Sequence, residues 1–172
     1  MPSETLTMLK LMVLYMLKLV HFPLSNAQMS GFFLENNYTD YFTFQQVIGG
    51  LLDSRLIQPE KTHNSTLYEI TKEGEEVLFY FEGRLSDPTK KDIEEFLEDN
   101  SYEIRKENSV LSGFRHLQNG DLEVHLEVRE GKHNLIELKM NAASEDAAKK
   151  MCEQWQGKSE IIFKYLLKEL MD

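Results

Sequence analysis

The sequence predicts an α+β protein in which three helices, a β-hairpin and a fourth helix are followed by a three-stranded antiparallel sheet, covered on one face by C-terminal helices. Three observations lead to this prediction. Apolar residues recur at helical spacing in three segments before residue 55, two short strand patterns follow at residues 56–70, and residues 110–140 alternate apolar and polar side chains around an Asn-Gly turn. The 172 residues suffice for two small domains, which we place at residues 1–86 and 87–172.

The first helix is predicted to be a core helix rather than a signal peptide or a membrane span. Apolar residues recur at helical spacing through residues 5–22, but the apolar run between Lys10 and Lys18 has only seven residues. A membrane span needs roughly 18. Glu4 stands where a signal peptide carries basic residues, and the single cysteine, Cys152, allows no internal disulfide. We therefore expect a cytoplasmic protein without membrane contact.

The second and third helices are predicted from residues that cap helix ends. Ser25 and Gln28 fit a capping box, in which each side chain bonds the backbone N–H of the other residue. Asp40 is a suitable N-cap for a third helix over residues 41–54, with an apolar stripe on one side and polar residues on the other.

A β-hairpin with strands at residues 56–61 and 66–70 leads directly into the fourth helix. Thr71 stands where an N-cap belongs, and Gly74 lies inside the first helical turn. Glycine costs about 1 kcal/mol relative to alanine in a helix interior. We therefore expect another part of the backbone to approach Gly74 closely.

Three helices, a hairpin and a fourth helix together form a winged helix. The segment LLDSRLI at residues 51–57, the hairpin, and the pattern Tyr68-x-Ile70-Thr71-x-x-Gly74-x-x-x-Leu78 resemble the end of the recognition helix, the wing and the final helix of bacterial winged-helix regulators of the PadR and MarR groups. The resemblance implies that the glycine lets the last helix lie tightly against the helical core.

A second resemblance extends over nearly the whole chain. It rests on Pro23-Leu24-Ser25-Asn26-x-Gln28, on Asn37-Tyr38-x-x-Tyr41-Phe42-Thr43-x-Gln45-Gln46, and on Ala148 and Trp155. This combination resembles an uncharacterised bacterial family known only as a domain of unknown function, which implies a winged-helix start and no established biochemistry. Gly49 and Gly50 depart from this expectation, because they stand where better helix formers belong; the outward half of the third helix either frays or packs closely.

The second region is predicted to begin at Asp87, as an N-cap, with Pro88 as the first helical residue. Asn119-Gly120 predicts a type I′ turn between strands at residues 110–118 and 121–129. A third strand at residues 134–140 needs an odd-length connection to place its apolar residues on the same face.

After these strands, Ser144 is expected to cap a helix that Gly157 interrupts, and a second helical segment follows at residues 159–171. That segment carries more apolar residues than one buried stripe requires. Winged-helix regulators commonly address paired half-sites as two-fold dimers. We therefore expect a homodimer formed through residues 87–172.

Charge and motifs restrict the function. The net charge is −10, and residues 1–86 hold 6 basic and 10 acidic side chains, which argues against DNA binding unless cations gather locally. The sequence contains no P-loop, GxGxxG, GxSxG, HExxH or paired CxxC motif. We therefore expect no enzymatic activity and no cofactor, and we identify no catalytic residue.

The third helix and the hairpin supply the candidate DNA-binding residues of a transcriptional regulator. Glutamine can bond adenine, and threonine can contact thymine, from the exposed N-terminal part of a recognition helix. The candidates for base contact or close backbone approach are Tyr41, Thr43, Gln45, Gln46 and Gly49, and those for phosphate contact or the wing tip are Arg55, Lys61, His63 and Asn64. The alternative is a winged helix that uses the same face to bind a protein and not DNA.

A metal site on the predicted sheet is a further alternative. A type I′ turn at Asn119-Gly120 sets residue 116 opposite residue 123, so that His116, Glu123 and His125 share the polar face. Two histidines and a carboxylate can hold a metal ion. Alternating polar residues on a solvent-exposed sheet face produce the same pattern, and we expect no metal there.

Overall fold

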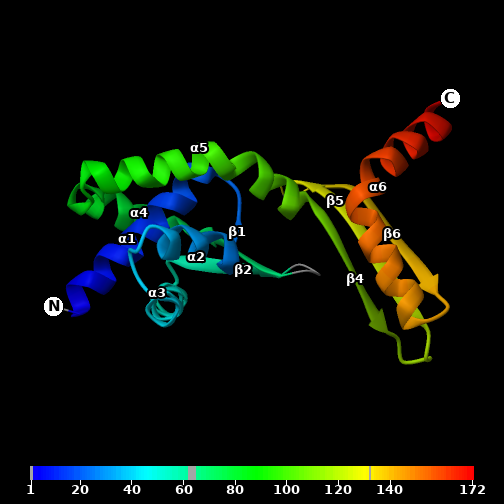
Figure 1. Ribbon diagram of the computed structural model, residues 1–172, viewed down its shortest axis with the longest axis horizontal. Coiled ribbons are helices and arrows are strands. Elements are labelled where there is room, and N and C mark those ends of the chain that lie inside the picture. The colour runs from blue at the N-terminus through cyan, green and yellow to red at the C-terminus, as the bar shows by residue number, and fades with distance from the viewer. Residues whose placement is uncertain (1, 62–64, 132) are drawn as a thin grey trace. The chain divides into compact units, whose positions relative to one another are not determined.

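The computed structural model describes residues 2–61, 65–131 and 133–172 (Figure 1). These residues form two compact units, an N-terminal unit up to residue 104 and a C-terminal unit from residue 105. The described part of the chain confirms the predicted α+β class, with a helical unit that contains a hairpin and a second unit built on a three-stranded sheet. None of the helices in the described ranges is long and apolar enough to cross a membrane.

The N-terminal unit has a winged-helix-like arrangement (Figure 1). Its strands form a three-stranded antiparallel sheet in the order β1-β3-β2, because the two residues of β1 add to the edge of the predicted hairpin. Its elements are α1 (Pro2–Val20), β1 (Leu24–Ser25), α2 (Asn26–Glu35), α3 (Tyr41–Asp53), β2 (Ile57–Lys61), β3 (Thr66–Ile70), α4 (Lys72–Phe81), η1 (Glu82–Arg84) and most of α5 (Asp87–Ser109).

The predicted caps of α2, α3 and α4 are confirmed. Ser25 and Gln28 form both bonds of a capping box, and the side chains of Asp40 and Thr71 accept hydrogen bonds from the backbone N–H groups of Thr43 and Gly74. Each of these bonds satisfies an N–H that the first helical turn leaves without an intrahelical partner. Local sequence therefore determines where these helices begin.

Helix α1 is the centre of the N-terminal core. Residues 11–17 of this helix are buried on every side, and α1 contacts α3, α4 and β3. A helix that is apolar all round belongs in a protein interior. The remaining core residues come mainly from α2 and α3, where Phe32, Phe33 and Phe44 pack ring against ring.

Gly74 of α4 lies against the backbone at the end of α3, as predicted. A Cβ atom on this residue would lie 2.1 Å from the carbonyl oxygen of Leu56. The same oxygen accepts the backbone N–H of Thr71, and the Thr71 hydroxyl donates to the carbonyl oxygen of Arg55. The start of α4 is thus bound directly to the α3–β2 corner, and only glycine fits at residue 74.

The predicted domain boundary at residues 86 and 87 differs from the division between the two units. Helix α5 continues to Ser109, and its buried residues Ile93, Leu97 and Ile104 belong to the N-terminal core. Burial, together with the hydrogen bond that the Tyr15 hydroxyl donates to Glu94, raises the pKa of this tyrosine. The cap also differs, because the Thr89 N–H donates to the Ser86 hydroxyl, so that Asp87 lies inside the helix.

The C-terminal unit is an antiparallel sheet with one face covered by a long helix (Figure 1). Strands β4 (Val110–His116), β5 (Leu122–Glu130) and β6 (His133–Ala142) pair in chain order, and α6 (Glu145–Met171) packs on them. The core between them contains Trp155, whose indole Nε1–H donates to the carbonyl oxygen of Glu127. The predicted interruption at Gly157 is wrong, because α6 is continuous through this residue.

The predicted turn between β4 and β5 is also wrong. Gly120 has a left-handed φ of 89°, Asn119 is not in the left-handed region, and the Gly120 N–H donates to Leu117 O. A type I′ turn needs positive φ at both central residues, whereas a three-residue loop needs it only at the glycine. The register shifts by one residue as a result, and His116 pairs with Leu122 instead of Glu123.

The predicted placement of the apolar residues of β5 and β6 on one face is confirmed, but a bulge within the strands produces it and not an odd-length loop, because Glu130 pairs with His133. Val124 pairs with Met140, and Val128 with Ile136, so the apolar residues of both strands share one face. The register then changes between Val128 and Arg129, where the pairing partner moves from Ile136 to Asn134. A bulge of one residue reverses the facing of every later side chain.

Candidate functional site

The outward face of α3 is the surface that a winged helix offers to a partner. Phe44, Val47, Ile48 and Leu51 are buried, so helical periodicity places residues 42, 46, 49 and 53 on the opposite side. Phe42, Gln46 and Asp53 are exposed there, and Gly49 is half-buried. We call these four residues the outward face. Of the residues predicted to read bases or to allow close approach, only Gln46 and Gly49 lie on it.

Gln45 holds the fold together and does not lie on the outward face. Its amide nitrogen donates to the side-chain oxygen of Asn26 at 2.7 Å, and the Asn26 amide donates back to Gln45 at 3.0 Å. The two reciprocal bonds join α3 to the first turn of α2 and use one donor and the acceptor of each amide. Gln45 therefore connects the two consecutive helices α2 and α3.

Phe42 is an exposed aromatic residue that sequence reasoning left out of the candidate list. Its side chain is 85% exposed, and its ring meets the half-exposed ring of Tyr41 edge to face at 6.2 Å. The helical period carried the signal, because residue 42 is four positions before Gln46 and seven before Gly49. An exposed aromatic pair at the start of a helix can contact either a nucleobase or an apolar pocket on a protein.

The two glycines of α3 have different surroundings. A Cβ on Gly50 would lie 2.8 Å from Cε and Nζ of Lys10, so the lysine side chain of α1 passes over this glycine. A Cβ on Gly49 would have no heavy atom within 4 Å. Close packing therefore accounts for Gly50 but not for Gly49, and α3 remains helical through both.

Cations lie beside the outward face rather than on it. Helix α3 contains no lysine or arginine, and Asp40 and Asp53 stand at its two ends. Arg55 is exposed at the α3–β2 corner with a left-handed φ of 57°, and Lys61 is exposed at the end of β2. The hydrogen bond from the Thr43 backbone lowers the pKa of Asp40, so this carboxylate stays charged at the N-terminus of α3. The predicted wing-tip residues His63 and Asn64 lie outside the described residues.

The structure does not bring together His116, Glu123 and His125, the three residues of the predicted metal site on the second sheet. His116 points to the α6 side, where its Nε2 lies 2.8 Å from Glu145 Oε1. Glu123 instead binds the guanidinium of Arg115 at 3.0 and 3.2 Å. The predicted three residues therefore do not form one cluster. The register differs by one residue from the register that a type I′ turn imposes, and this shift turns His116 away from the face that carries Glu123 and His125.

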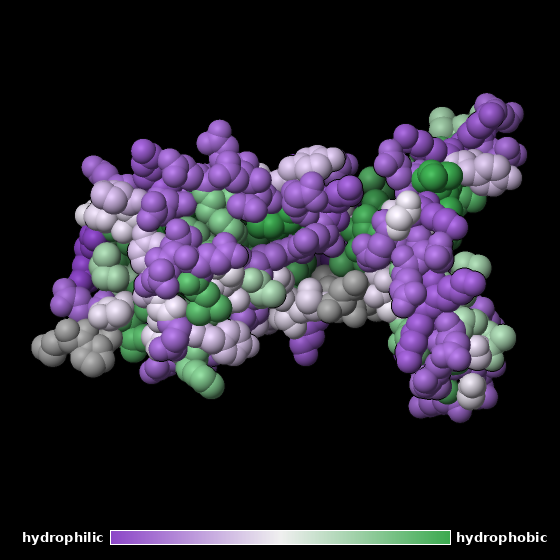
Figure 2. All heavy atoms as spheres, viewed as in Figure 1, coloured by the Kyte–Doolittle hydropathy of each residue, from purple (hydrophilic) through white to green (hydrophobic). Residues whose placement is uncertain are grey.

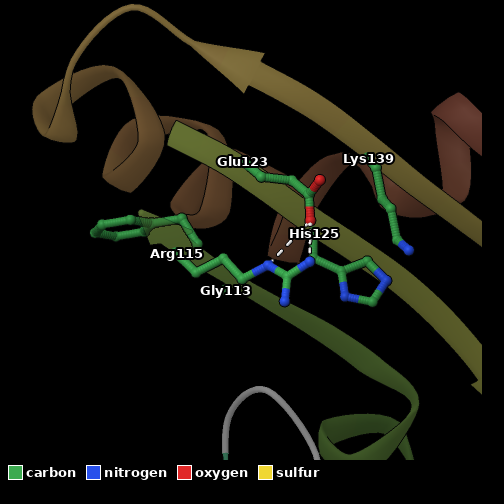
Figure 3. A pocket seen from close by; sticks show the side chains of 6 residues that line it. Gly113, Arg115, Glu123, His125 and Lys139 are labelled. Carbon is green, nitrogen blue, oxygen red and sulfur yellow. Dashed lines mark hydrogen bonds and ion pairs between the residues drawn. The ribbon is translucent and has the colours of Figure 1, made fainter. Parts of the chain in front are cut away.

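A pocket of about 190 Å³ opens on this polar face beside His125 (Figure 3). The Arg115–Glu123 pair lies on one side of it, and His125 and Lys139 lie on the other. Gly113 pairs with His125 across β4 and β5, and a glycine has no side chain to fill the space. The hollow is small, so the chemistry around it depends on the side chains of His125 and its neighbours.

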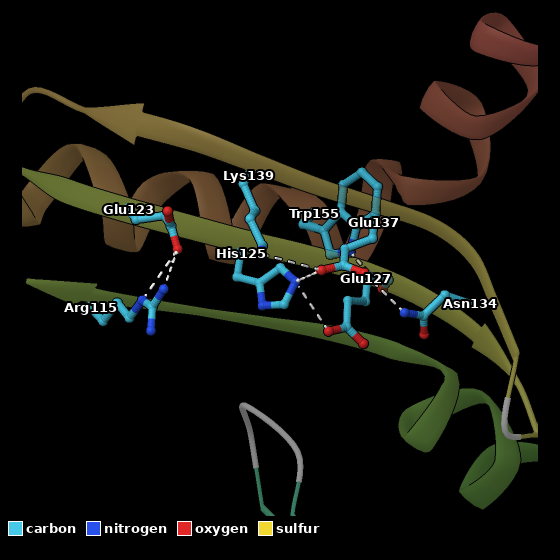
Figure 4. A network of polar contacts seen from close by, with 8 residues as sticks. All are labelled: Arg115, Glu123, His125, Glu127, Asn134, Glu137, Lys139 and Trp155. Atoms are coloured by element: carbon cyan, nitrogen blue, oxygen red, sulfur yellow. Dashed lines mark hydrogen bonds and ion pairs between the residues drawn. The ribbon is translucent and has the colours of Figure 1, made fainter. Parts of the chain in front are cut away.

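His125 also faces two carboxylates on the other side of its ring (Figure 4). Its Nε2 lies 2.8 Å from Oε1 of Glu137 and 3.2 Å from Oε1 of Glu127. The amide of Asn134 donates to the second oxygen of Glu137 at 3.1 Å. The hydrogen bond from His125 is the main reason that the pKa of Glu137 is lowered. Strand alternation alone places Glu127 on the same face as His125, two residues along β5, whereas only the observed register of β5 and β6 identifies Glu137 as their neighbour.

Comparison with known proteins gives one result that covers most of the chain. No curated protein and no solved structure gives a significant match. A family described as "Domain of unknown function (DUF4364)" matches residues 9–170, a range that includes all of α2 to β6 and most of α1 and α6. Because the match spans more than nine-tenths of the chain, the protein belongs to this family of unknown function.

Proposed function

We propose that the N-terminal unit binds double-stranded DNA through the outward face of α3, as a winged-helix transcriptional regulator. The observation that carries the proposal is that the fold leaves this face uncovered, with Phe42 and Gln46 exposed beside a three-stranded wing. A glutamine can bond the N6 and N7 of adenine, and a phenylalanine can contact a thymine methyl group. The resemblance of residues 51–78 to PadR and MarR regulators supports the same assignment.

Phosphate contacts would come from the cations beside this face. Lys10 crosses α3 at Gly50, Arg55 stands at the α3–β2 corner, and Lys61 ends β2. Three cations can neutralise only a few DNA phosphates, and the chain as a whole carries a net charge of −10. We therefore propose weak non-specific binding, in which base contacts supply most of the preference for a site.

Two substitutions should separate base contacts from phosphate contacts. We expect Gln46→Ala to cost about 1–3 kcal/mol on a selected duplex and to relax its sequence preference. Lys61→Ala should weaken binding to all sequences alike and lower the salt slope by about one unit. Both effects are measured by fluorescence anisotropy with selected and random duplexes.

The matched control for this experiment is Gln118→Ala, which removes an exposed glutamine from the β4–β5 loop. We expect it to leave affinity and salt slope unchanged. Gln45→Ala should lower the free energy of unfolding through the lost Asn26 bonds. If Gln118→Ala weakens binding as much as Gln46→Ala, the assignment of α3 to base contact fails.

A protein partner is the second candidate for the same face. The observation that favours it is Phe42, which is 85% exposed on a helix without any lysine or arginine. Aromatic residues of this kind often anchor protein interfaces in a pocket of the partner. A Phe42→Ser variant that loses a protein partner and leaves DNA affinity unchanged would favour this candidate.

We also propose that the protein is a homodimer formed through α6. Ile162 still packs on the sheet core, but from Ile161 onward α6 also carries exposed apolar residues, and apolar patches appear near its C-terminal end in Figure 2. The exposed ones are Ile161, Tyr165, Leu167, Leu170 and Met171. An isolated exposed leucine is common, but a helix end that is apolar on several sides commonly marks an interface.

Light scattering tests the dimer directly. We expect a mass of two chains of 20.1 kDa each for the wild type, and a mass of one chain for an Ile161→Glu, Leu170→Glu variant. Glu160→Gln, on the same helix and exposed, is the control that should remain dimeric. A single-chain mass for the wild type at high micromolar concentration contradicts the proposal.

A further inference from the structure

We propose that His125, Glu127 and Glu137 form a binding site for one divalent transition-metal ion on the polar face of the C-terminal sheet (Figure 4). These three side chains bring an imidazole nitrogen and two carboxylate oxygens within 4.8 Å of one another. The site does not depend on the proposed DNA binding, because all three residues belong to β5 and β6 of the C-terminal unit.

The strand register places two like charges directly opposite each other. Glu127 of β5 pairs with Glu137 of β6, and both side chains lie on the same face as His125. Like charges at directly paired positions destabilise a sheet. Glu127 is only 8% exposed, so its carboxylate is held against the sheet, within reach of Glu137 and His125. A cation bound between the two strands would offset the repulsion between the paired glutamates.

One imidazole N–H is a poor match for two carboxylates. Nε2 of His125 faces Oε1 of both glutamates, and a single N–H cannot point along both the 2.8 Å and the 3.2 Å vectors. A metal ion can occupy the centre of the three atoms instead. With bonds of about 2.0–2.2 Å to nitrogen and oxygen, tetrahedral ligand atoms stand roughly 3.3 Å apart. The 3.2 Å distance from Nε2 to Glu127 is close to this value, and the 2.8 Å distance to Glu137 would lengthen by about 0.5 Å on metal binding.

The surroundings of the cluster suit a metal ion as well. Asn134 donates to the second oxygen of Glu137 and thereby fixes the orientation of this carboxylate, as outer-shell residues of metal sites do. Lys139 lies 3.8 Å from Glu137 and is more than half exposed, so it can swing away from an incoming ion. Two carboxylates and a neutral imidazole carry two negative charges, which matches a divalent cation.

The donor set selects the class of ion. Imidazole nitrogen favours Zn²⁺, Fe²⁺, Ni²⁺ and Cu²⁺ over Mg²⁺ and Ca²⁺, which prefer oxygen alone. Three protein ligands leave at least one position for water. The ion would bridge β5 and β6 next to the bulge at Val128 and Arg129, so it would stabilise the register of these strands.

The test is a calorimetric titration of the chelator-treated full-length protein with Zn²⁺, followed by Mg²⁺ as the comparison ion. We expect one Zn²⁺ per chain and at least about tenfold weaker Mg²⁺ binding. Glu127→Gln and Glu137→Gln, which preserve shape, should each weaken Zn²⁺ binding at least about tenfold. Asn134→Ala should weaken it by about tenfold without removing a ligand.

His116→Ala is the matched control, because His116 also stands beside a glutamate but lies on the other side of the sheet. It should leave the Zn²⁺ affinity unchanged. Circular dichroism checks that each variant folds, and Asn134→Ala provides a test that retains all three ligands. Absence of Zn²⁺ binding, or an affinity that follows His116 and not Glu127, Glu137 and Asn134, overturns the proposal.

Discussion

Gly74→Ala is expected to lower the free energy of unfolding of the N-terminal unit by roughly 3 kcal/mol or more. The added Cβ would lie 2.1 Å from the carbonyl oxygen of Leu56 and 2.8 Å from Cγ1 of Ile70. Relief requires α4 to move away from the α3–β2 corner, which breaks the bonds that Thr71 makes there. Urea denaturation followed by far-ultraviolet circular dichroism measures the change.

Gly49→Ala is the matched control, because it replaces a helical glycine whose Cβ position is open. Alanine is about 1 kcal/mol more favourable than glycine in a helix interior. The two substitutions should therefore shift the stability in opposite directions. If Gly74→Ala leaves the free energy of unfolding unchanged or raises it, α4 does not approach the Leu56 carbonyl as closely as described.

Trp155→Ala is expected to lower the free energy of unfolding of the C-terminal unit by about 3–5 kcal/mol. The Trp155 side chain is 1% exposed and fills the small core between α6 and the sheet. The substitution leaves a cavity and removes the Nε1–H bond to the carbonyl oxygen of Glu127. Hydrogen exchange of the β5 amide groups detects the loss in this unit separately from the N-terminal unit.

Trp155→Phe distinguishes the two contributions, because it keeps most of the ring volume and removes the hydrogen bond. We expect it to cost about 1–3 kcal/mol, less than Trp155→Ala. An effect of Trp155→Ala below about 1 kcal/mol would mean that α6 does not pack on the sheet through this residue.

The N-terminal unit could be predicted in detail because its signals are local. Ser25, Asp40 and Thr71 each accept a backbone N–H three residues later, and such bonds depend only on neighbouring residues. Gly74 also follows from local reasoning, since a helical glycine needs a contact to explain it. What the sequence did not show is that Gln45 bonds Asn26, because this contact connects residues 19 positions apart.

The C-terminal unit was less predictable because its pairing depends on turn geometry. Asn-Gly fits a type I′ turn and also a three-residue loop with glycine in the left-handed region. The two alternatives differ by one residue in register, which decides whether residue 123 pairs with His116 or with Arg115. The cluster around His125 depends in turn on the register of β5 and β6, which the sequence patterns do not specify.

The length of two helices likewise exceeded what local patterns predict. Gly157 was expected to end a helix, but α6 continues because both sides of this glycine have strong helix formers. Helix α5 crosses the predicted boundary because its apolar residues Ile93, Leu97 and Ile104 complete the N-terminal core. Tertiary packing, which one segment cannot reveal, determines both outcomes.

Titration of a random-sequence duplex at about 50 mM salt, repeated at increasing salt, tests the proposed function most directly, because electrostatic affinity is strong at low salt. We predict detectable binding whose salt slope corresponds to about 2–4 phosphates per chain, in line with the few cations beside α3. We also predict tighter binding to a duplex selected from a random pool. If neither duplex binds at this salt concentration, the DNA-binding proposal is contradicted, and the exposed Phe42 face is assigned to a protein partner.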